Sequence, residues 1–284
     1  MKAPPFDYLR ATSLAQVFQL LQQHGDDARV LAGGQTLIAS LNMRLSEPGL
    51  LIDIGALQAL RGITLQGSML RLGALATHAD IERSPLVAQH APLLAQAAPH
   101  IAHAAIRNRG TLGGSLAYAD PAAEWPACML ALDATLVLAS SRGERQVPAG
   151  DFFTGLYSTA LADDEIIVAC DVAVLASGER QAFDELARRH GDYAMAGLAA
   201  RASLHDGRLQ GLRLAFLGLE DKPVRALRTE QALEGRTVDD ATLALAVQSL
   251  RAELQPAADL TSGVATKQQL AGVLAQRVLR RLAA

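Results

Sequence analysis

The segment IRNRGTLGGSLAYADPAAEWPA, residues 106–127, is the most informative part of the chain, because glycines punctuate it more densely than any other polar segment. Gly110, Gly113 and Gly114 stand beside small hydroxyl residues. Glycine tolerates positive φ and lets a ligand come close to the main chain, so successive N–H groups can converge on one anion. The segment therefore predicts an anion-binding loop, although a simple turn would use the same residue types.

A second loop of similar composition, LAGGQT at residues 31–36, leads into a predicted helix over residues 37–45. About four hydrogen bonds to a charged group, each contributing roughly 1.5–3 kcal/mol, could hold a diphosphate without a lysine, and neither loop contains one. Neither loop has the G-x-G-x-x-G spacing of a dinucleotide-binding motif or the Gly-Lys-Ser/Thr ending of a phosphate-binding loop. From the glycines alone, a diphosphate site and a pair of ordinary turns are about equally supported.

Outward from these loops, the apolar pattern divides the chain into three predicted parts, residues 1–58, 59–175 and 176–284. The first part is expected to be β-α-β. A shift in composition at residues 176–179 marks the linker into the third part. That part is expected to contain a hairpin that turns at Asp206-Gly207, followed by three helices.

Three local expectations concern the second part. Asp80 is placed to cap a helix, residues 92–104 read as an alanine-rich helix, and residues 142–151 read as turn-rich. Strands are expected on both sides of the turn-rich stretch. The second part is thus expected to mix helices with short strands.

Composition excludes several classes of protein. Half of the 284 residues are apolar and the net charge is −3, without a basic stripe interleaved with aromatics, so no nucleic-acid surface is expected. No stretch approaches the ~18 apolar residues of a membrane helix, and we expect a cytoplasmic protein. Cys128 and Cys170 are the only cysteines. They are expected to be reduced, buried thiols, because an iron–sulfur cluster normally takes four.

The amino-acid sequence of both loops resembles the two FAD-binding stretches of the medium flavoprotein subunit of carbon monoxide dehydrogenase, in the xanthine dehydrogenase family. The matching segments are LAGGQTLIASLNMRL, residues 31–45, and residues 106–127. FDYLRATSLAQVFQLL (6–21) and FDELARRHGDYAMAGLAA (183–200) are also similar to that subunit. The resemblance covers nearly the whole chain, in the same order and spacing.

The resemblance implies an α+β fold: a PCMH-type FAD-binding domain of two subdomains, then a C-terminal α+β domain with a small antiparallel sheet and helices. The FAD diphosphate would lie between the glycine loops, held by main-chain amides of both. Asp120 and Glu124 match positions where a polar or acidic side chain meets the cofactor, and Tyr193 matches an aromatic that can lie over the isoalloxazine ring. The other positions carried over as FAD contacts are Leu31, Ala32, Gly33, Gly34, Gln35, Thr36, Thr77, Ile106, Gly110, Thr111, Gly113, Gly114, Ser115 and Ile167.

Plainer interpretations of the carried-over side chains stay open. Asp120 precedes a proline and could simply begin a turn, Glu124 could be a solvated carboxylate at a helix start, and Tyr193 could be an ordinary strand aromatic. The sequence also departs from the family pattern. Ser115 stands where an asparagine is common, and Glu185 lies in a stretch where relatives often carry a lysine.

The sequence shows no nucleophile–base pair, no paired carboxylates and no set of metal ligands, so we predict no catalytic residue and no metal site on this chain. The resemblance implies an oxidoreductase subunit that transfers electrons through FAD. A large molybdenum–pterin subunit and a small subunit with two [2Fe–2S] clusters would be its partners, as a dimer of heterotrimers. The alternatives are a stand-alone FAD oxidase and a flavin-binding accessory protein.

Overall fold

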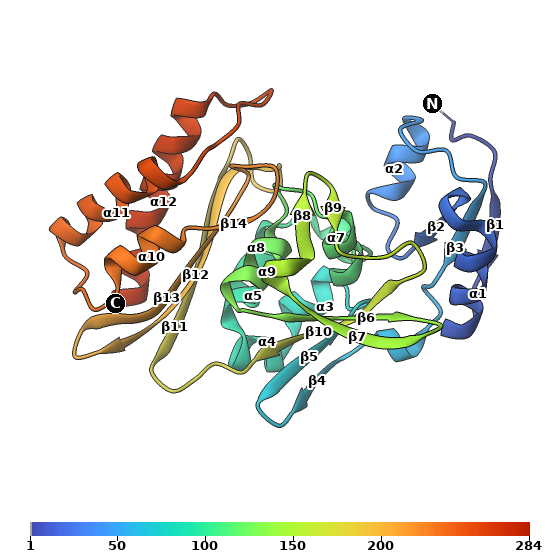
Figure 1. Ribbon diagram of the computed structural model, residues 1–284, viewed down its shortest axis with the longest axis horizontal. Helices are drawn as coiled ribbons and strands as arrows, with labels where there is room; N and C mark the ends of the chain where they lie inside the picture. Colours follow the sequence, from blue (N-terminus) through green and yellow to red (C-terminus); the bar gives the residue numbers. More distant parts are fainter. Residues whose placement is uncertain (1) are drawn as a thin grey trace.

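The computed structural model describes residues 2–284, so the first residue of the predicted N-terminal part lies outside the described residues. The N-terminal elements (Figure 1) are β1 (Asp7–Arg10), α1 (Leu14–His24), β2 (Ala28–Leu31), α2 (Leu37–Asn42) and β3 (Leu50–Asp53). The three strands form a parallel sheet with β3 in the middle. Helix α1 begins where the Ser13 side chain accepts a hydrogen bond from the Gln16 amide, and its apolar side packs on the sheet.

The central sheet is antiparallel, in the order β4-β5-β10-β6-β7. Its strands are β4 (Ile63–Gln66), β5 (Met69–Gly73), β6 (Thr135–Ser140), β7 (Gly143–Pro148) and β10 (Ile166–Ala173). The helices of this part are α3 (His78–Arg83), α4 (Pro85–His90), α5 (Pro92–Ala97), α6 (Ala104–Arg107), α7 (Leu112–Tyr118), α8 (Glu124–Ala131) and α9 (Ala149–Phe152). A short hairpin, β8 (Phe153–Gly155) and β9 (Ser158–Thr159), follows α9.

The central sheet is buried on both faces. Along β6, Leu136 and Leu138 belong to the core formed with the helices, whereas Val137 and Ala139 belong to the core shared with the N-terminal sheet. This alternation follows from the two-residue period of a strand. The central sheet therefore holds the N-terminal part and the helices in a fixed relation.

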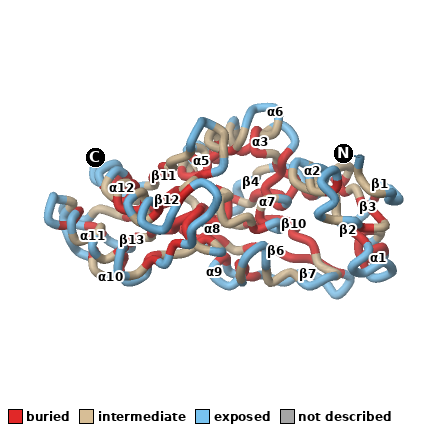
Figure 2. The backbone as a smooth tube through the Cα atoms, turned by 90° about the horizontal axis from the view of Figure 1, so that it is seen from above, coloured by how far each residue is buried: buried red, intermediate tan, exposed pale blue. Residues whose placement is uncertain are grey.

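The C-terminal part contains a four-stranded antiparallel sheet, β11-β12-β13-β14, and three helices. Its elements are β11 (Glu179–Ala187), β12 (Ala194–His205), β13 (Arg208–Leu217), β14 (Val224–Arg225), α10 (Leu227–Leu233), α11 (Asp240–Glu253) and α12 (Val264–Ala283). Asp206 and Gly207 both have positive φ, 50° and 72°, in the predicted tight turn. The sheet and helices enclose their own buried core (Figure 2).

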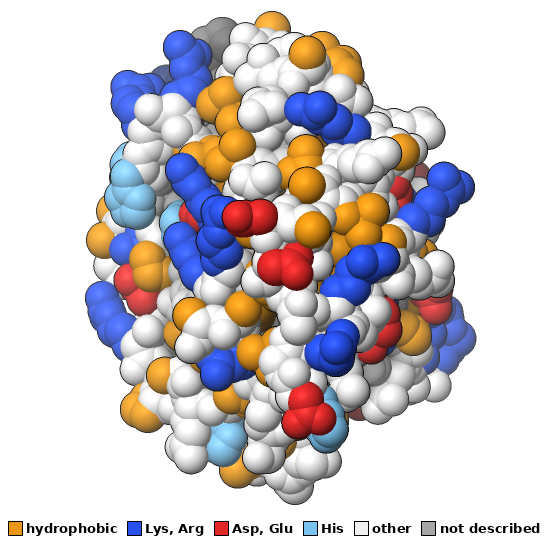
Figure 3. All heavy atoms as spheres, turned by 90° about the vertical axis from the view of Figure 1, so that its left-hand side faces the viewer, with side chains coloured by type: hydrophobic (Ala, Val, Ile, Leu, Met, Phe, Trp, Pro, Cys, Tyr) orange, Lys and Arg blue, Asp and Glu red, His pale blue; other side chains and the backbone are white. Residues whose placement is uncertain are grey.

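The outer side of the C-terminal part carries charged side chains of both signs, interspersed with isolated hydrophobic residues (Figure 3). A surface of this kind suits contact with water. Within residues 2–284, no helix combines the length and the apolar character that crossing a membrane requires.

Three local predictions were wrong. Residues 142–151, expected to be turn-rich, contain β7, which pairs with β6 through the whole length of both strands. Asp80 is the third residue of a capping box that Thr77 begins, not the cap itself. The helix expected over residues 92–104 ends at Ala97 and passes into a 3-10 turn, Ala98–His100, that contains Pro99.

The predicted fold class is confirmed. The chain is α+β: a three-stranded sheet, a five-stranded sheet, a two-stranded hairpin and their helices precede the C-terminal part, which is a four-stranded antiparallel sheet with helices. This arrangement brings loops that are distant in sequence to the same region of the molecule, as the contacts of the glycine loops show.

Candidate functional site

The two glycine loops touch each other through their main chains. A β-carbon built on Gly33 would lie 2.1 Å from the carbonyl oxygen of Arg109 and 2.9 Å from the α-carbon of Gly110. Both distances are far below van der Waals contact, so a side chain at Gly33 would force the loops apart. Glycine at this position therefore permits the close approach of two segments that are far apart in sequence.

The first loop presents main-chain amides that are not used inside the protein. Among residues 2–284, no protein acceptor receives a hydrogen bond from the amides of Gly33, Gly34, Gln35 or Thr36. Gly34 has a φ of +73°, which turns the chain between β2 and α2. The side chain of Gln35 donates to the Gly33 carbonyl at 3.1 Å, so it stabilises the turn from outside.

The second loop uses most of its amides internally. The amide of Gly113 donates to the Ala74 carbonyl at 2.8 Å, and that of Gly114 donates to the Thr111 side chain at 3.1 Å. The amide of Ser115 donates to the carbonyl of Thr111 at 3.1 Å, inside the first turn of α7. This loop is therefore a helix start with its donors already engaged.

Positive φ is not the reason for the glycines of the second loop. Gly110, Gly113 and Gly114 all lack it, so the expectation holds only for Gly34. Close packing is the reason instead: a β-carbon on Gly113 would lie 2.6 Å from the Ala74 β-carbon, and one on Gly114 would lie 2.9 Å from Thr111 Oγ1.

A buried histidine, which sequence reasoning missed, supports the second loop. His78 is 6% exposed, and its amide donates to the Gly110 carbonyl at 2.9 Å. The indole N–H of Trp125 donates to His78 Nδ1 at 2.9 Å. Burial, and then the charge of Arg107, lower the pKa of His78 to about 4, so the ring is neutral and can accept this bond. The sequence gives no reason to expect this role for a single histidine at a helix start.

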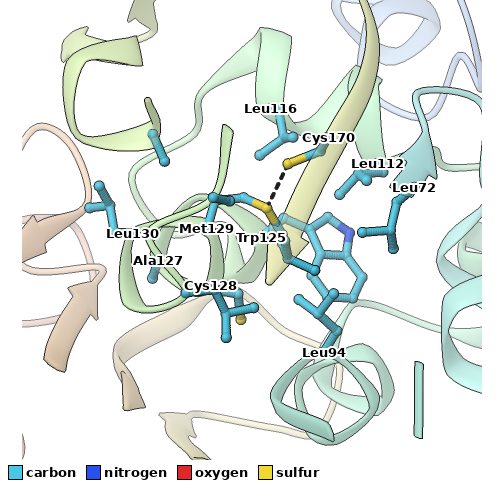
Figure 4. Packing of buried hydrophobic residues seen from close by; sticks show 14 of the residues in the cluster. Leu72, Leu94, Leu112, Leu116, Trp125, Ala127, Cys128, Met129, Leu130 and Cys170 are labelled. Atoms are coloured by element: carbon cyan, nitrogen blue, oxygen red, sulfur yellow. Dashed lines mark hydrogen bonds between the residues drawn. The ribbon is translucent and has the colours of Figure 1, made fainter. Parts of the chain in front are cut away.

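Trp125 and the two cysteines belong to the core beneath the site. Trp125 lies among Leu72, Leu94 and Leu112, and the thiol of Cys170 lies 3.1 Å from the sulfur of Met129 (Figure 4). Both cysteines are free and buried, as predicted.

The three weaker candidate positions differ in their surroundings. Thr77 begins α3 and forms an isolated antiparallel bridge with Thr111, so it lies directly beside the second loop. The carbonyl of Ile106 accepts the Gly110 amide at 2.8 Å. Ile167, by contrast, is 5% exposed in the core of the central sheet, which leaves little of its side chain for a ligand.

The acidic and aromatic candidates differ in their contacts and their burial. Asp120 Oδ1 accepts the Ala122 amide at 2.9 Å, which is the turn-forming contact weighed as its plain interpretation. Glu124 is 8% exposed, so its interpretation as a solvated carboxylate is wrong. Tyr193 is 69% exposed; desolvation and then the charge of Asp120 raise its pKa, and Glu124 contributes as well.

Two further tyrosines, which were not predicted, pack against each other. The rings of Tyr118 and Tyr157 lie 5.1 Å apart, between the end of α7 and the β8–β9 hairpin. Desolvation raises the pKa of both tyrosines, and the charge of Asp120 adds to the effect in each case. Tyr118, Tyr157 and Tyr193 are all exposed. The Tyr118 and Tyr157 rings come together only in the folded chain, so no sequence pattern predicts their contact.

The C-terminal part positions both the acidic turn and Tyr193. The amide of Gly218 donates to the Pro121 carbonyl at 2.8 Å, and buried Lys267 donates to the Gly218 carbonyl at 2.7 Å. Gly191 packs against the loop before α6, where a β-carbon would lie 2.6 Å from the Ala102 carbonyl oxygen. Residues of the third predicted part therefore complete the candidate site.

The donors and acceptors of this site suit a dinucleotide such as FAD. Unpaired amides of the first loop offer donors for a diphosphate without any lysine. Asp120 is half-buried and offers a polar group for ribose or ribityl hydroxyls, and the exposed ring of Tyr193 offers a flat apolar surface. The residues present therefore fit an anionic group at the glycine loops and a neutral, aromatic group near the tyrosines.

Comparison with known proteins finds matches along both parts of the chain. Residues 4–172 match the family model described as the FAD binding domain in molybdopterin dehydrogenase. Residues 181–282 match the model described as the CO dehydrogenase flavoprotein C-terminal domain.

Individual relatives match over nearly their full length. The chain is 38% identical to subunit alpha of the 6-hydroxypseudooxynicotine dehydrogenase complex from Paenarthrobacter nicotinovorans, over 99% of this chain and 95% of the relative. It is 35% identical to the carbon monoxide dehydrogenase medium chain of Hydrogenophaga pseudoflava, over 98% of this chain and 97% of the relative. A solved structure of carbon monoxide dehydrogenase from Hydrogenophaga pseudoflava, which lacks the Mo-pyranopterin moiety of its molybdenum cofactor, matches with a TM-score of 0.97 and 36% identity. That match covers 99% of this chain and 98% of the other.

Proposed function

The chain belongs to the family of FAD-binding medium subunits of molybdenum hydroxylases, which includes carbon monoxide dehydrogenase and xanthine dehydrogenase, and on this premise we propose that it transfers electrons within a larger complex. The electrons come from [2Fe–2S] clusters on a small partner subunit. They leave to an external acceptor. A large partner subunit with a molybdenum–pterin centre oxidises the organic substrate, and the complex is a dimer of heterotrimers located in the cytoplasm.

One observation carries this proposal: the main-chain contact of Gly33 with Arg109 and Gly110. It joins loops from the N-terminal and central sheets into a single cradle. The unpaired amides of the first loop bind a diphosphate whatever organic substrate the complex oxidises. An electron-transfer role needs no more than a bound cofactor held in a fixed place, because the cofactor carries the chemistry.

The chain's own residues bind and orient the cofactor. Amides of residues 33–36 hold the diphosphate, and the second loop, fixed by its internal hydrogen bonds, forms the opposite wall. Asp120 and Glu124 bind hydroxyl groups of the cofactor, and Tyr193 covers its ring system. When bound, FAD supplies the ability to take up and release electrons.

Recovery of the intact complex tests the proposal. The chain is tagged in its native host, purified, and examined for subunit composition, FAD and iron content. We expect three different subunits in equal amounts, and FAD that is reduced when a pre-reduced small subunit is mixed with the chain in a stopped-flow spectrometer.

Two outcomes contradict the proposal. A lone chain that oxidises an organic substrate by itself supports a stand-alone oxidase. A lone chain that keeps FAD but never exchanges electrons with the small subunit supports an accessory protein.

A further inference from the structure

Gly218 lies where the acidic turn and the segment of Tyr193 meet. Its amide donates to the Pro121 carbonyl at 2.8 Å, and Pro121 directly follows Asp120. A β-carbon on Gly218 would lie 2.9 Å from the carbonyl oxygen of Ala194, the residue after Tyr193. One glycine therefore touches the main chain of both segments that carry these candidate FAD contacts.

The conformation of this residue favours glycine. Gly218 has a φ of +75°, a value that other residue types rarely adopt. A β-carbon there would also lie 3.2 Å from the carbonyl oxygen of Met195. Because glycine has more conformational freedom than any other residue, its orientation must be fixed by contacts from outside.

The C-terminal sheet separates α12 from the helices of the central part. Along β12, Leu198 and Ala200 belong to the core formed with the C-terminal helices, whereas Ala199 belongs to the core formed with the central helices. Helix α12 covers one face of the sheet and α8 covers the other (Figure 1). A side chain of α12 can therefore meet the turn before α8 at the end of the sheet, where β13 stops.

Lys267 makes this connection. It lies in the first turn of α12, is 4% exposed, and donates from its ammonium to the Gly218 carbonyl at 2.7 Å. The same ammonium lies 2.6 Å from Oδ2 of Asp259. A lysine is almost never buried unless it is paired. Gly218 thus receives a charged donor at its carbonyl while its amide donates to Pro121, so it connects α12 to the acidic turn.

The counter-charge of Lys267 is held in place by its own loop. Asp259 lies between α11 and α12, and its Oδ1 accepts hydrogen bonds from the amides of two residues further along that loop. The same loop also holds the residue after Gly218, because the Ala257 amide donates to the Leu219 carbonyl at 2.9 Å. Two consecutive residues at the end of β13 are therefore fixed from the side of α12.

We propose that Lys267 is a positioning residue for the flavin: it fixes the conformation of Gly218 and so sets where the Asp120 turn and Tyr193 lie relative to each other. The inference rests on the cofactor contacts of Asp120 and Tyr193 proposed above. Among residues 2–284, the polar partners of Lys267 are Gly218 and Asp259, and neither is a candidate FAD contact. The effect of Lys267 on the cofactor therefore passes through Gly218.

The first experiment separates positioning from stability in the full chain. Lys267→Met removes the ammonium and keeps a long unbranched side chain. We expect the FAD affinity, measured by fluorescence titration, to fall about tenfold. The visible absorption bands of the flavin that remains bound should shift, because Tyr193 moves relative to the ring system. The unfolding temperature should fall as well.

The matched control lowers stability at the other end of the C-terminal part. Asp239→Ala removes the cap of α11, close to Thr237, which bridges to Arg208 at the far end of β13 from Gly218. This variant should unfold at a lower temperature than the wild type. Its FAD affinity and flavin spectrum should stay unchanged, which shows that loss of stability alone does not move either readout.

The second experiment tests whether Lys267 acts through the two proposed contacts. In a chain that carries both Asp120→Ala and Tyr193→Ala, adding Lys267→Met should lower FAD affinity by less than about twofold, because the groups that it positions are already gone. If the losses multiply instead, Lys267 acts on the cofactor by another route and the proposal is overturned.

The remaining outcomes are equally decisive. Wild-type FAD affinity and spectrum in folded Lys267→Met overturn the positioning role. If Lys267→Met does not fold, Asp259→Asn replaces it, because this change removes the counter-charge and keeps the ammonium. It should lower FAD affinity by a smaller factor, and an unchanged affinity overturns the proposal.

Failure of the inference differs from failure of the proposed function. Unchanged FAD affinity in the chain with Asp120→Ala and Tyr193→Ala refutes the proposed cofactor contacts, and the positioning role with them. Unchanged affinity in Lys267→Met alone refutes only the positioning role. Neither titration depends on electron transfer from the small subunit, which is tested separately by reduction of the flavin in the wild-type chain.

Discussion

The two glycine loops are similar in sequence but differ in how their main-chain amides are used in the structure. In the loop at residues 31–36, the amides of residues 33–36 have no protein acceptors. In the loop at residues 110–115, most amides donate hydrogen bonds, to groups at the start of α7 and to Ala74 among others. Gly34 has positive φ, and the glycines of the second loop do not. A pair of glycines therefore does not by itself mean free donors.

Because only the first loop has free amides, the two loops contribute differently to the site. The first is a source of unpaired donors, and the second is a rigid wall that glycines allow to pack tightly against Ala74 and His78. Substitutions in the first loop should therefore act mainly on FAD affinity, and substitutions in the second mainly on stability. Four variants test this division, in order of decreasing expected effect.

Gly33→Ala should have the largest effect, because its β-carbon meets the rigid carbonyl of Arg109. We expect a loss of about 1–3 kcal/mol of stability from overpacking and a fall in FAD affinity of more than about tenfold. Visible absorbance of the purified protein gives the FAD content, and thermal unfolding gives the stability. Gly150→Ala is the control, because a β-carbon there meets nothing within 4 Å. If Gly33→Ala kept the wild-type FAD content, the close contact between the two glycine loops would not be needed for FAD binding.

Gly113→Ala should lower stability by about 1–3 kcal/mol, because its β-carbon meets both the side chain and the carbonyl of Ala74. The FAD affinity of the molecules that remain folded should fall less than in Gly33→Ala. Chemical denaturation and fluorescence titration with FAD measure the two quantities separately. If Gly113→Ala lost as much FAD affinity as Gly33→Ala and kept its stability, both loops would contribute to FAD binding in the same way.

Thr111→Val should cost about 1 kcal/mol by removing the cap of α7. It also frees the amide of Gly114, which makes the second loop more like the first. Thermal unfolding is the measurement, and Thr111→Ser, which keeps the hydroxyl, is the control. Equal melting temperatures for the valine and serine variants would mean that the cap contributes nothing.

Gln35→Ala should have the smallest effect, within about 0.5 kcal/mol, because its side chain is exposed and only supports the turn. If main-chain amides bind the diphosphate, FAD affinity should stay close to that of the wild type in an equilibrium titration. A tenfold loss of affinity would instead assign the binding to the side chain.

The sequence identified the glycine loops and the acidic positions but not the groups that support them. Thr77 was predicted only as a cofactor contact, because it matched a position in the related subunit; the fold shows that it lies beside the second loop. The roles of His78 and of the Tyr118–Tyr157 pair depend on contacts between distant segments, which no local spacing encodes. The domain limits at 58/59 and 175/176 and the FAD contacts of the individual residues stay predictions.

The sequence by itself indicated the local features of the fold. These are hydroxyl residues that cap helices, alternating apolar residues along strands, and glycines where the main chain must turn or pack closely. These features depend on a few neighbouring residues, so they determined the element types and the family. Only the tertiary structure decided which amides remain free, which carboxyl groups become buried, and which tyrosine rings pack together. Those properties depend on the surroundings that distant segments create, because burial and proximity, rather than residue type, set the energy of a donor or a charge.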